Sequence, residues 1–291
     1  MTTPAATPVP GISGELLESP VWDDRRELLW LVDIAGRRVL GHAPGRGLAH
    51  DHVMPSEPGS LALADDGALV VALRDCVARL DPESGNLVTL AKADHDPRTT
   101  RLNDGRCDRQ GRFWVGSIYE PRDQARAKLY RLDRDRLVPV IEGITLANGL
   151  AFAADGRSGF HADTPTRTIW QFDLDPKTGA ISRRREFVRF GPEARPDGAT
   201  LDAEGGYWIA AIDAGEVRRY LPDGRLERRV VVPTPWPTMI AFAGKNLRAG
   251  YVTSLRHQRP TELVAAHPLS GGLFQFASDI PGLAEPRVGL R

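Results

Sequence analysis

The stretch Arg101-Leu-Asn-Asp-Gly-Arg-Cys-Asp-Arg-Gln-Gly-Arg-Phe-Trp-Val-Gly-Ser117 contains, in order, a polar loop, a Gln110-Gly111 pair and an aromatic and β-branched run. A polar residue followed by glycine is typical of a tight turn, and β-branched and aromatic side chains favour strands. The stretch therefore predicts a hairpin. Variants of the same layout recur along the chain, and this recurrence indicates the fold.

Four copies of the hairpin have a turn glycine between two strand-like runs, at Gly67, Gly111, Gly156 and Gly205, which lie 44, 45 and 49 residues apart. Two less regular copies flank this set, around residues 21–32 and 240–253. Further strand-like runs follow each hairpin, and amphipathic helical periodicity is not evident. Six units of about four strands at this period match the blades of a β-propeller. We therefore predict an all-β, six-bladed β-propeller with four-stranded blades around a central channel.

The domain boundaries follow from the same repeat. Residues 13–291 are predicted to form a single propeller domain. Residues 1–12, which are rich in Thr, Ala and Pro, are predicted to be a disordered tail. Because the ring must close, a strand near the start of the chain should complete the last blade. We expect Glu15-Leu16-Leu17 to take that place beside residues 271–277.

Charge and cysteine content exclude several function classes. The 38 basic and 38 acidic residues cancel, so no charged surface indicates nucleic acid or a membrane as a partner. No apolar run approaches the ~18 residues of a membrane span. Cys76 and Cys107 make no disulfide framework, and residues 1–10 lack the pattern of a signal peptide. We expect a cytoplasmic protein, a monomer or weak homo-oligomer, whose partner is a small molecule.

One position of the repeat varies in a way that indicates chemistry. It lies eight residues before each turn glycine, and it holds Gly59, Asn103, Asn148 and Asp197 in the four regular units. The comparable place in the first unit holds Glu18, and in the sixth it falls at residues 236–238. The innermost strands of a propeller line its channel. The four polar side chains are therefore predicted to converge on one axial point.

Two carboxylates and two amide oxygens at one point would form an all-oxygen cage. Close carboxylates repel each other unless a cation compensates them. Oxygen donors suit Ca²⁺, Mg²⁺ or Mn²⁺, and the set is also compatible with Zn²⁺ or Fe²⁺. Asn-Gly and Asp-Gly are ordinary turn signals, but the turn of each unit already lies eight residues later. We therefore predict a metal-containing channel with one divalent cation, held by Glu18, Asn103, Asn148 and Asp197.

Four motifs together resemble the gluconolactonase/regucalcin (senescence marker protein) family: Glu18-Ser-Pro-Val-Trp22, Arg101-Leu-Asn-Asp-Gly105, Asn148-Gly-Leu-Ala-Phe152 and Pro196-Asp-Gly198. The similarity extends from about residue 15 to about residue 276. It implies a six-bladed propeller with one divalent metal that hydrolyses sugar lactones.

The resemblance also implies roles for individual residues. Glu18, Asn103, Asn148 and Asp197 match the metal ligands, and Asp197 also matches the general base. Arg101 and Asn103 match positions that contact substrate. Glu120 lies where the family often has an acidic substrate contact, although the segment 118–121 departs from the family's usual pattern.

Two other functions stay open at this point. The same site would suit another ester or a phosphotriester, and a non-catalytic calcium-binding propeller would also use four convergent oxygen ligands. Two further stretches are expected near the channel. His50-Asp51-His52 is expected in a solvated or channel-rim loop before the second blade, bordering the pocket, and Trp236 is a candidate for a pocket wall.

Overall fold

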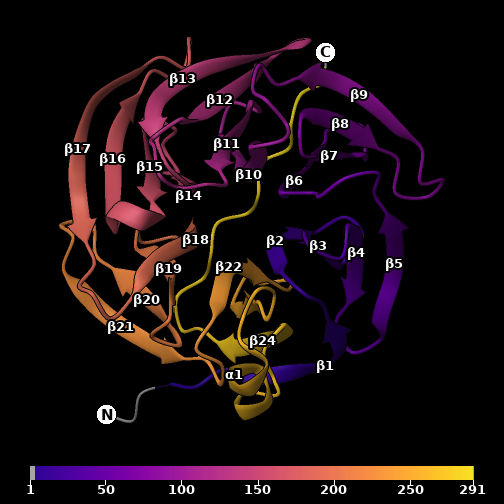
Figure 1. Ribbon diagram of the computed structural model, residues 1–291, viewed down its shortest axis with the longest axis vertical. Coiled ribbons are helices and arrows are strands. Elements are labelled where there is room, and N and C mark those ends of the chain that lie inside the picture. The colour runs from indigo at the N-terminus through magenta and orange to yellow at the C-terminus, as the bar shows by residue number, and fades with distance from the viewer. Residues whose placement is uncertain (1–3, 291) are drawn as a thin grey trace.

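The computed structural model describes residues 4–290 and consists almost entirely of β-strands. Within these residues the strands form six four-stranded antiparallel sheets, which are arranged in a ring around a central axis (Figure 1). In five of the sheets the strands follow one another in chain order from the channel outward. The predicted six-bladed β-propeller with four-stranded blades is confirmed.

The bounds of the elements follow the repeat. Blades 1 and 2 contain β2 (Leu17–Asp23), β3 (Leu28–Asp33), β4 (Arg38–Ala43), β5 (Gly47–Val53), β6 (Ser60–Leu63), β7 (Leu69–Ala72), β8 (Cys76–Leu80) and β9 (Leu87–Lys92). Blades 3 and 4 contain β10 (Thr100–Cys107), β11 (Phe113–Tyr119), β12 (Ala127–Asp133), β13 (Arg136–Ile144), β14 (Ala147–Phe152), β15 (Ser158–Asp163), β16 (Thr168–Leu174) and β17 (Ile181–Arg189). Blades 5 and 6 contain β18 (Arg195–Leu201), β19 (Tyr207–Ile212), β20 (Glu216–Tyr220), β21 (Leu226–Val231), β22 (Pro237–Ala243), β23 (Ala249–Ser254), β24 (Gly272–Ala277) and β1 (Thr7–Ser13).

Two short helical elements complete the chain. The 3₁₀ turn η1 (Thr164–Thr166) follows β15, and α1 (Thr261–Ala266) lies between β23 and β24. Among the described residues, neither element approaches the length and apolar character needed to cross a bilayer.

The ring closes through the start of the chain, but not through the expected residues. β1 pairs antiparallel with β24, with Thr7 opposite Gln275 and Val9 opposite Leu273. The closing strand is therefore Thr7–Ser13, and the prediction that residues 15–17 would take this place is wrong. Leu17 instead begins β2, the innermost strand of the first blade.

The prediction of a disordered tail is also wrong for residues 4–12, whereas residues 1–3 lie outside the described residues. The side chains of Val9 and Ile12 are buried and pack in one cluster with Leu273 and Tyr251. Ala6 donates a backbone hydrogen bond to the carbonyl of Val231 (2.8 Å). Proline lacks a backbone donor but is tolerated on an edge strand, so the Pro-rich composition does not prevent pairing here.

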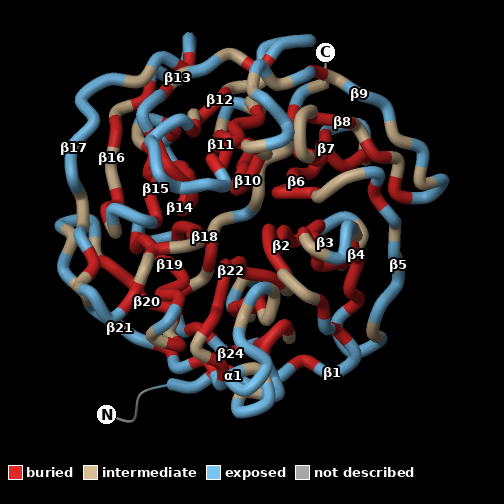
Figure 2. Tube along the Cα trace, viewed as in Figure 1, coloured by how far each residue is buried: buried red, intermediate tan, exposed pale blue. Residues whose placement is uncertain are grey.

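The core lies between the blades. Six main clusters of buried side chains each join two neighbouring blades. Trp30 of blade 1, for example, packs with Leu61 and Val71 of blade 2, and Trp208 of blade 5 packs with Phe242 of blade 6. Figure 2 shows that the inner strands are buried and the outermost strands largely exposed. The inner strands are thus fixed from both sides, which holds the residues at their ends in place.

The last residues of the chain cover one end of the channel. After β24 the chain runs past the turns of the inner hairpins: Ala203 donates to the carbonyl of Pro281 (2.9 Å), and Gly289 donates to the carbonyl of Gly111 (3.0 Å). The turn glycines lie at the far end of the innermost strands from the predicted ligands. The C-terminal segment therefore covers the end of the channel opposite those ligands.

Candidate functional site

Five of the six innermost strands have a β-bulge at the end of the channel where the predicted ligands lie. In each case three residue steps on the inner strand face two on its neighbour. β6 pairs with β7 without a shift, and the residue before it is Gly59, which offers no ligand. Bulges re-aim side chains and are frequent beside active sites. Here the bulges place a polar side chain at the channel from each of five blades: Glu18, Asn103, Asn148, Asp197 and Thr238.

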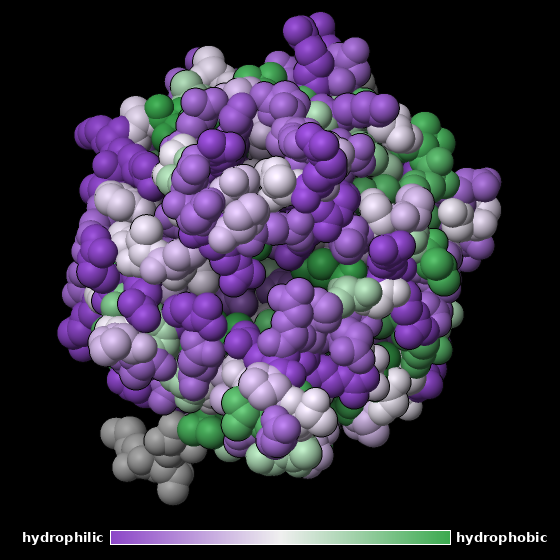
Figure 3. Space-filling model, viewed as in Figure 1, coloured by the Kyte–Doolittle hydropathy of each residue, from purple (hydrophilic) through white to green (hydrophobic). Residues whose placement is uncertain are grey.

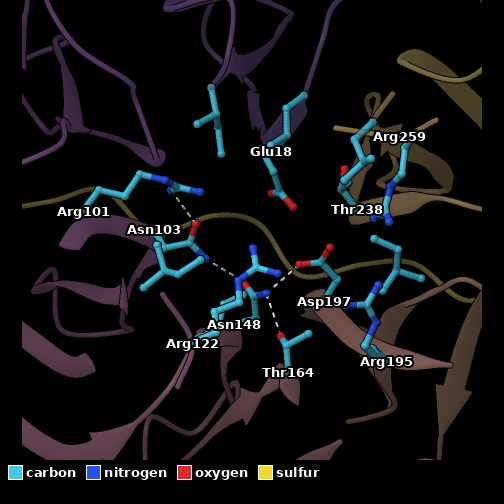
Figure 4. Close-up of a pocket in the computed structure, with 16 residues that line it drawn as sticks. Glu18, Arg101, Asn103, Arg122, Asn148, Thr164, Arg195, Asp197, Thr238 and Arg259 are labelled. Atoms are coloured by element: carbon cyan, nitrogen blue, oxygen red, sulfur yellow. Dashed lines mark hydrogen bonds between the residues drawn. The ribbon is translucent and has the colours of Figure 1, made fainter. Parts of the chain in front are cut away.

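These five side chains line one pocket at the centre of the ring. Figure 4 shows Glu18 and Asp197 facing the same space, with Asn103 and Asn148 beside them. On the face drawn in Figure 3 the centre of the ring is hollowed, and the surrounding surface is mostly hydrophilic. The structure therefore brings together all four residues predicted to hold a metal, and their role as ligands stays a prediction.

A chain of hydrogen bonds runs across the pocket floor. Nη1 of Arg101 donates to Oδ1 of Asn103 (2.7 Å), Nδ2 of Asn103 donates to Oδ1 of Asn148 (2.8 Å), and Nδ2 of Asn148 donates to Oδ1 of Asp197 (2.7 Å). Asn148 also donates to Oγ1 of Thr164 (2.9 Å), which in turn donates to a backbone carbonyl of β18 (2.8 Å). Asn103, Asn148 and Asp197 are thus linked to one another across three neighbouring blades.

The two pocket carboxylates lie in an environment that opposes their charge. Burial raises the pKa of Glu18 well above its usual value of 4.5, and the charges of Asp197 and Asp104 raise it further. Burial and the charge of Asp104 likewise raise the pKa of Asp197 well above 3.8, although Arg195 opposes this shift. A cation between the carboxylates would remove this penalty, so the charge distribution fits a bound divalent ion.

The donor set fits a hard cation as well. Two carboxylates and two amide groups supply only oxygen ligands, which suit ions such as Ca²⁺ and Mg²⁺. Residues 4–290 contain no cluster of three or more His, Cys, Asp and Glu side chains with a metal-binding arrangement. The capacity to hold a metal therefore depends on the mixed set of Glu18, Asp197 and the two asparagines.

Asp104 is a carboxylate that sequence reasoning missed, because its place before Gly105 indicated only a flexible loop. Its Oδ2 accepts a hydrogen bond from the backbone N–H of Leu150 (2.9 Å), while its buried Oδ1 has no partner among the described residues. Burial raises the pKa of Asp104 to about 6. Asp104 thus adds a third carboxyl group to the electrostatics of the site.

Glu120 lies in a cleft that adjoins the pocket and that shares Arg101 with it. Its carboxylate binds Nη1 of Arg74 (3.0 Å) and lies 3.6 Å from Nε of Arg101. It lines a neighbouring cleft together with Arg101, and it does not line the pocket that contains Asp197. Burial lowers the pKa of Arg101 to about 10, although the charge of Glu120 acts in the opposite direction. Glu120 therefore holds Arg101 in place, and its contact with substrate stays a prediction.

Several pocket residues were not predicted, namely Arg122, Thr164, Arg195 and Arg259. Thr238, by contrast, lies in the segment 236–238 that the repeat marked in the sixth unit. A sequence signal existed for Arg195, because Arg195-Pro-Asp197 has the same spacing as Arg101-Leu-Asn103. No comparable signal existed for Arg122 or Arg259, since both lie in connections outside the repeated hairpin.

Two expectations about the channel rim are wrong. His50 and His52 lie on β5, the outermost strand of blade 1, where His50 packs against Trp30 with ring centroids 5.0 Å apart. They therefore do not border the pocket. Trp236 is buried in a small cluster with Ile212 and lies under the guanidinium of Arg259, 5.2 Å from its ring centroid. It supports a pocket residue instead of forming the wall.

Comparisons with known proteins agree with this geometry. The model of the SMP-30/gluconolactonase/LRE-like region matches residues 16–256. A 6-deoxy-6-sulfogluconolactonase of Pseudomonas putida is 39% identical over 272 residues, which cover 92% of this chain and 93% of that protein. Regucalcin of Gallus gallus is 32% identical over 267 residues, or 89% of each protein. A calcium-binding regucalcin of Agrobacterium tumefaciens has a TM-score of 0.93 at 26% identity, with 99% of both chains covered. The chain therefore belongs to the SMP-30/gluconolactonase/LRE-like family.

Proposed function

We propose that this lactonase opens sugar lactones to aldonic acids at the central pocket, with a divalent cation bound there and Asp197 as the general base. One observation carries the proposal above all others. Oxygen-bearing side chains from blades 1, 3, 4 and 5 meet at one point, and a guanidinium group, that of Arg101, is hydrogen-bonded to one of them.

Glu18, Asn103, Asn148 and Asp197 would hold the cation. When bound, it would act as a Lewis acid on the ester carbonyl and lower the pKa of a coordinated water. The two carboxylates would balance its charge, and the cation would offset the burial and the neighbouring negative charges that raise the pKa of both groups. With these four residues as its ligands, the cation would still be able to accept the substrate and a water.

Asp197 would move the proton. Its carboxylate accepts a proton from the attacking water as the new C–O bond forms, and it returns a proton to the ring oxygen as the ester bond breaks. Asn148 fixes its position by donating to Oδ1 over 2.7 Å. The base is thus held before substrate arrives, which reduces the reorganisation needed during the reaction.

Arg101 and Asn103 would bind the sugar. The side chain of Arg101 is only 11% exposed, and its Nη1 donates to Asn103 Oδ1. A buried guanidinium makes strong, directional hydrogen bonds to hydroxyl groups or to a developing oxyanion. This polar pair favours a hydroxylated lactone over an apolar ester.

The relatives narrow the choice of substrate and metal. Because the Pseudomonas putida relative is named a 6-deoxy-6-sulfogluconolactonase, glucono-type lactones are the first substrates to test. Because the Agrobacterium tumefaciens neighbour is described as calcium-binding, Ca²⁺ is the first ion to test, followed by Zn²⁺, Mn²⁺, Mg²⁺ and Fe²⁺.

A lactone panel with a pH indicator, run on EDTA-treated protein before and after each cation is restored, tests the proposal. We expect hydrolysis to disappear with EDTA and to return with at least one cation. Full activity in protein that elemental analysis shows to be metal-free would exclude the metal role. Binding of Ca²⁺ with no hydrolysis of any lactone would indicate a non-catalytic calcium-binding propeller.

A further inference from the structure

The pocket is lined by four arginines, Arg101, Arg122, Arg195 and Arg259, and they differ in how their charges are balanced. On the Arg101 side the charges cancel. Arg74 binds Glu57 (2.9 Å) and Glu120 (3.0 Å), and Glu120 also lies near Arg101. Two arginines thus face two glutamates, which makes this wall suitable for neutral hydroxyl groups.

The opposite side of the pocket begins with Arg195. Its Nε and Nη2 both donate to the carboxylate of Asp213, at 2.7 and 3.1 Å. A two-point contact of this kind fixes the plane of the guanidinium. Its Nη1 has no hydrogen-bond partner among the described residues, so one donor stays free at the pocket. Figure 4 shows Arg195 on the Asp197 side of the pocket, away from Arg101.

Arg259 lies on the same side and forms no ion pair with an acidic side chain within residues 4–290, although the charges of Asp213 and Asp197 reach it. Its guanidinium lies over the ring of the buried Trp236, 5.2 Å from the centroid, and its Nε is buried without a hydrogen-bond partner. Contact with an aromatic face holds a guanidinium in place but leaves its in-plane N–H groups free. Arg259 is therefore a positioned donor group that no described residue satisfies.

Arg122 completes the group from the connection between β11 and β12. Its side chain is exposed and makes no hydrogen bond or ion pair with the described residues. Figure 4 shows its guanidinium in front of Asn148, between the Arg101 and Asp197 sides. Its charge acts on both Arg101 and Arg259. Mutual repulsion of this kind favours a bound anion.

The charges of the pocket therefore do not cancel once the site is loaded. A divalent cation would balance Glu18 and Asp197, and Arg195 is balanced by Asp213. Arg122 and Arg259 then remain as two positive charges without an ion-pair partner among the described residues, and Asp104 is the one further carboxyl group of the site to set against them. A neutral aldonolactone offers only hydroxyl groups and would leave both without a counter-charge. A lactone with an anionic substituent would bind them by charge-assisted hydrogen bonds.

We propose that the preferred substrate is a sugar lactone with an anionic group at the end distant from the ester, such as a sulfonate or a phosphate, and that Arg259, Arg195 and Arg122 form its binding site. This inference rests on the proposed lactone hydrolysis. Arg195 and Arg259 lie next to Asp197, so the anion and the ester are bound on adjoining parts of one pocket. Arg259 and Arg122 determine the specificity because, among residues 4–290, neither guanidinium is ion-paired with an acidic side chain, although the charges of Asp213 and Asp197 act on Arg259 from a distance.

The test compares kcat/KM for glucono-1,5-lactone, its 6-phosphate and its 6-deoxy-6-sulfonate, with the restored cation. Charge-assisted hydrogen bonds contribute about 1.5–3 kcal/mol, which corresponds to roughly tenfold to a hundredfold in kcat/KM. We expect the wild type to prefer at least one anionic lactone by such a factor. The two anionic arms show whether a sulfonate or a phosphate fits better.

Arg259→Gln and Arg122→Gln should each lower the ratio of anionic to neutral kcat/KM about tenfold or more, and Arg259→Lys should restore part of it. Arg136→Gln is the matched control, since it removes the same charge from the exposed outer strand β13; its ratio should equal that of the wild type. Calorimetry with 6-phosphogluconate measures binding independently of turnover. Affinity should be highest in the wild type and Arg136→Gln, lower in Arg259→Lys, and lowest in Arg259→Gln and Arg122→Gln.

Two outcomes separate this inference from the proposed function. Hydrolysis of glucono-1,5-lactone at least as fast as of both anionic lactones would overturn the inference and leave lactone hydrolysis intact. Absence of hydrolysis for every lactone with every cation would overturn the proposed function instead. If Arg136→Gln lowered the ratio of anionic to neutral kcat/KM as much as Arg259→Gln and Arg122→Gln do, general surface charge, and not these arginines, would set the preference for anionic lactones.

Discussion

Asn148 donates a hydrogen bond from Nδ2 to Oδ1 of Asp197 over 2.7 Å, although the two residues belong to different blades. The same amide accepts a hydrogen bond from Asn103. One side chain therefore connects the inner strands of blades 3, 4 and 5. Since the inter-blade clusters fix these strands, the carboxylate of Asp197 is positioned by packing that lies outside the pocket.

Asp197→Asn tests the role of this carboxylate. The amide has nearly the same shape but cannot accept a proton from water, so we expect kcat to fall about 10²–10⁴-fold, the usual effect of losing general-base catalysis. Calorimetric titration with the activating cation should still detect binding. Asp155→Asn, an exposed turn residue of blade 4, should keep wild-type turnover. Similar turnover in the Asp197 variant and the wild type would exclude Asp197 as the base.

The pocket carboxylates also predict how metal-free stability depends on pH. Burial raises the pKa of both Glu18 and Asp197 in the folded state above the unfolded values of about 4.5 and 3.8. A carboxyl group of this kind destabilises the folded state once it ionises, and this penalty is absent below the unfolded pKa. The free energy of unfolding of the metal-free protein should therefore lose a contribution as pH rises through the folded pKa values.

Thermal melts of EDTA-treated wild type and of a Glu18→Gln/Asp197→Asn variant, at pH 5.5 and pH 8, check this expectation. The variant should gain more in melting temperature over the wild type at pH 8 than at pH 5.5. The comparison also removes the contribution of His161, whose pKa burial lowers to about 3 and which acts in the opposite sense. An identical gain at both pH values would contradict the expectation.

The repeat predicted the site because turn glycines and inner strands are both visible in sequence. Asn103 and Asp197 lie within their bulges, whereas Glu18 and Asn148 each lie one residue before theirs. Counting eight residues back from the turn glycine still reaches Asn148, because the segment from the start of the bulge to the turn is one residue shorter in blade 4 than in blades 3 and 5. Bulges change the register without any sequence signal of their own, so the count identified the residues but not their geometry.

The position of Arg259 at the pocket and the closing strand β1 depend on tertiary contacts that the repeat does not encode. Arg259 follows β23 in a connection that has no counterpart in the other units, and only packing on Trp236 brings it to the pocket. Likewise, Val9 and Ile12 are spaced by three residues in a Pro-rich segment, which does not show the alternation of a strand. Their burial follows from the open edge of β24 and not from local propensity.

Asp202 is predicted to be a main contributor to stability in blade 5. Its fully buried carboxylate accepts hydrogen bonds from Nε1 of Trp208 (2.7 Å), Nε of Arg219 (2.6 Å) and the backbone N–H of Gly206 (2.8 Å). Asp202→Ala would leave Nε1 of Trp208 and the N–H of Gly206 without their acceptor, and Arg219 would keep only its contacts with Glu204 and Glu227 at the protein surface. The free energy of unfolding should therefore fall by about 3–5 kcal/mol. Denaturant titration measures this. Asp223→Ala, at an exposed turn of the same blade, should change it by less than about 1 kcal/mol.

The closing strand β1 gives the last prediction, because it supplies the outer edge of the only blade built from both ends of the chain within the described residues. Val9→Asp/Ile12→Asp would place charges in the cluster that joins β1 to blade 6. Loss of two buried aliphatic side chains alone costs about 3–6 kcal/mol, so we expect β1 to detach and the melting temperature to fall sharply. The free edge of β24 should then promote association, visible as larger species in size-exclusion chromatography.

Thr7→Asp/Ser13→Asp adds the same charges at exposed positions of the same strand and should leave the protein with the wild-type melting temperature and elution volume. Equal behaviour of the two double variants would show that the ring does not depend on β1 for closure.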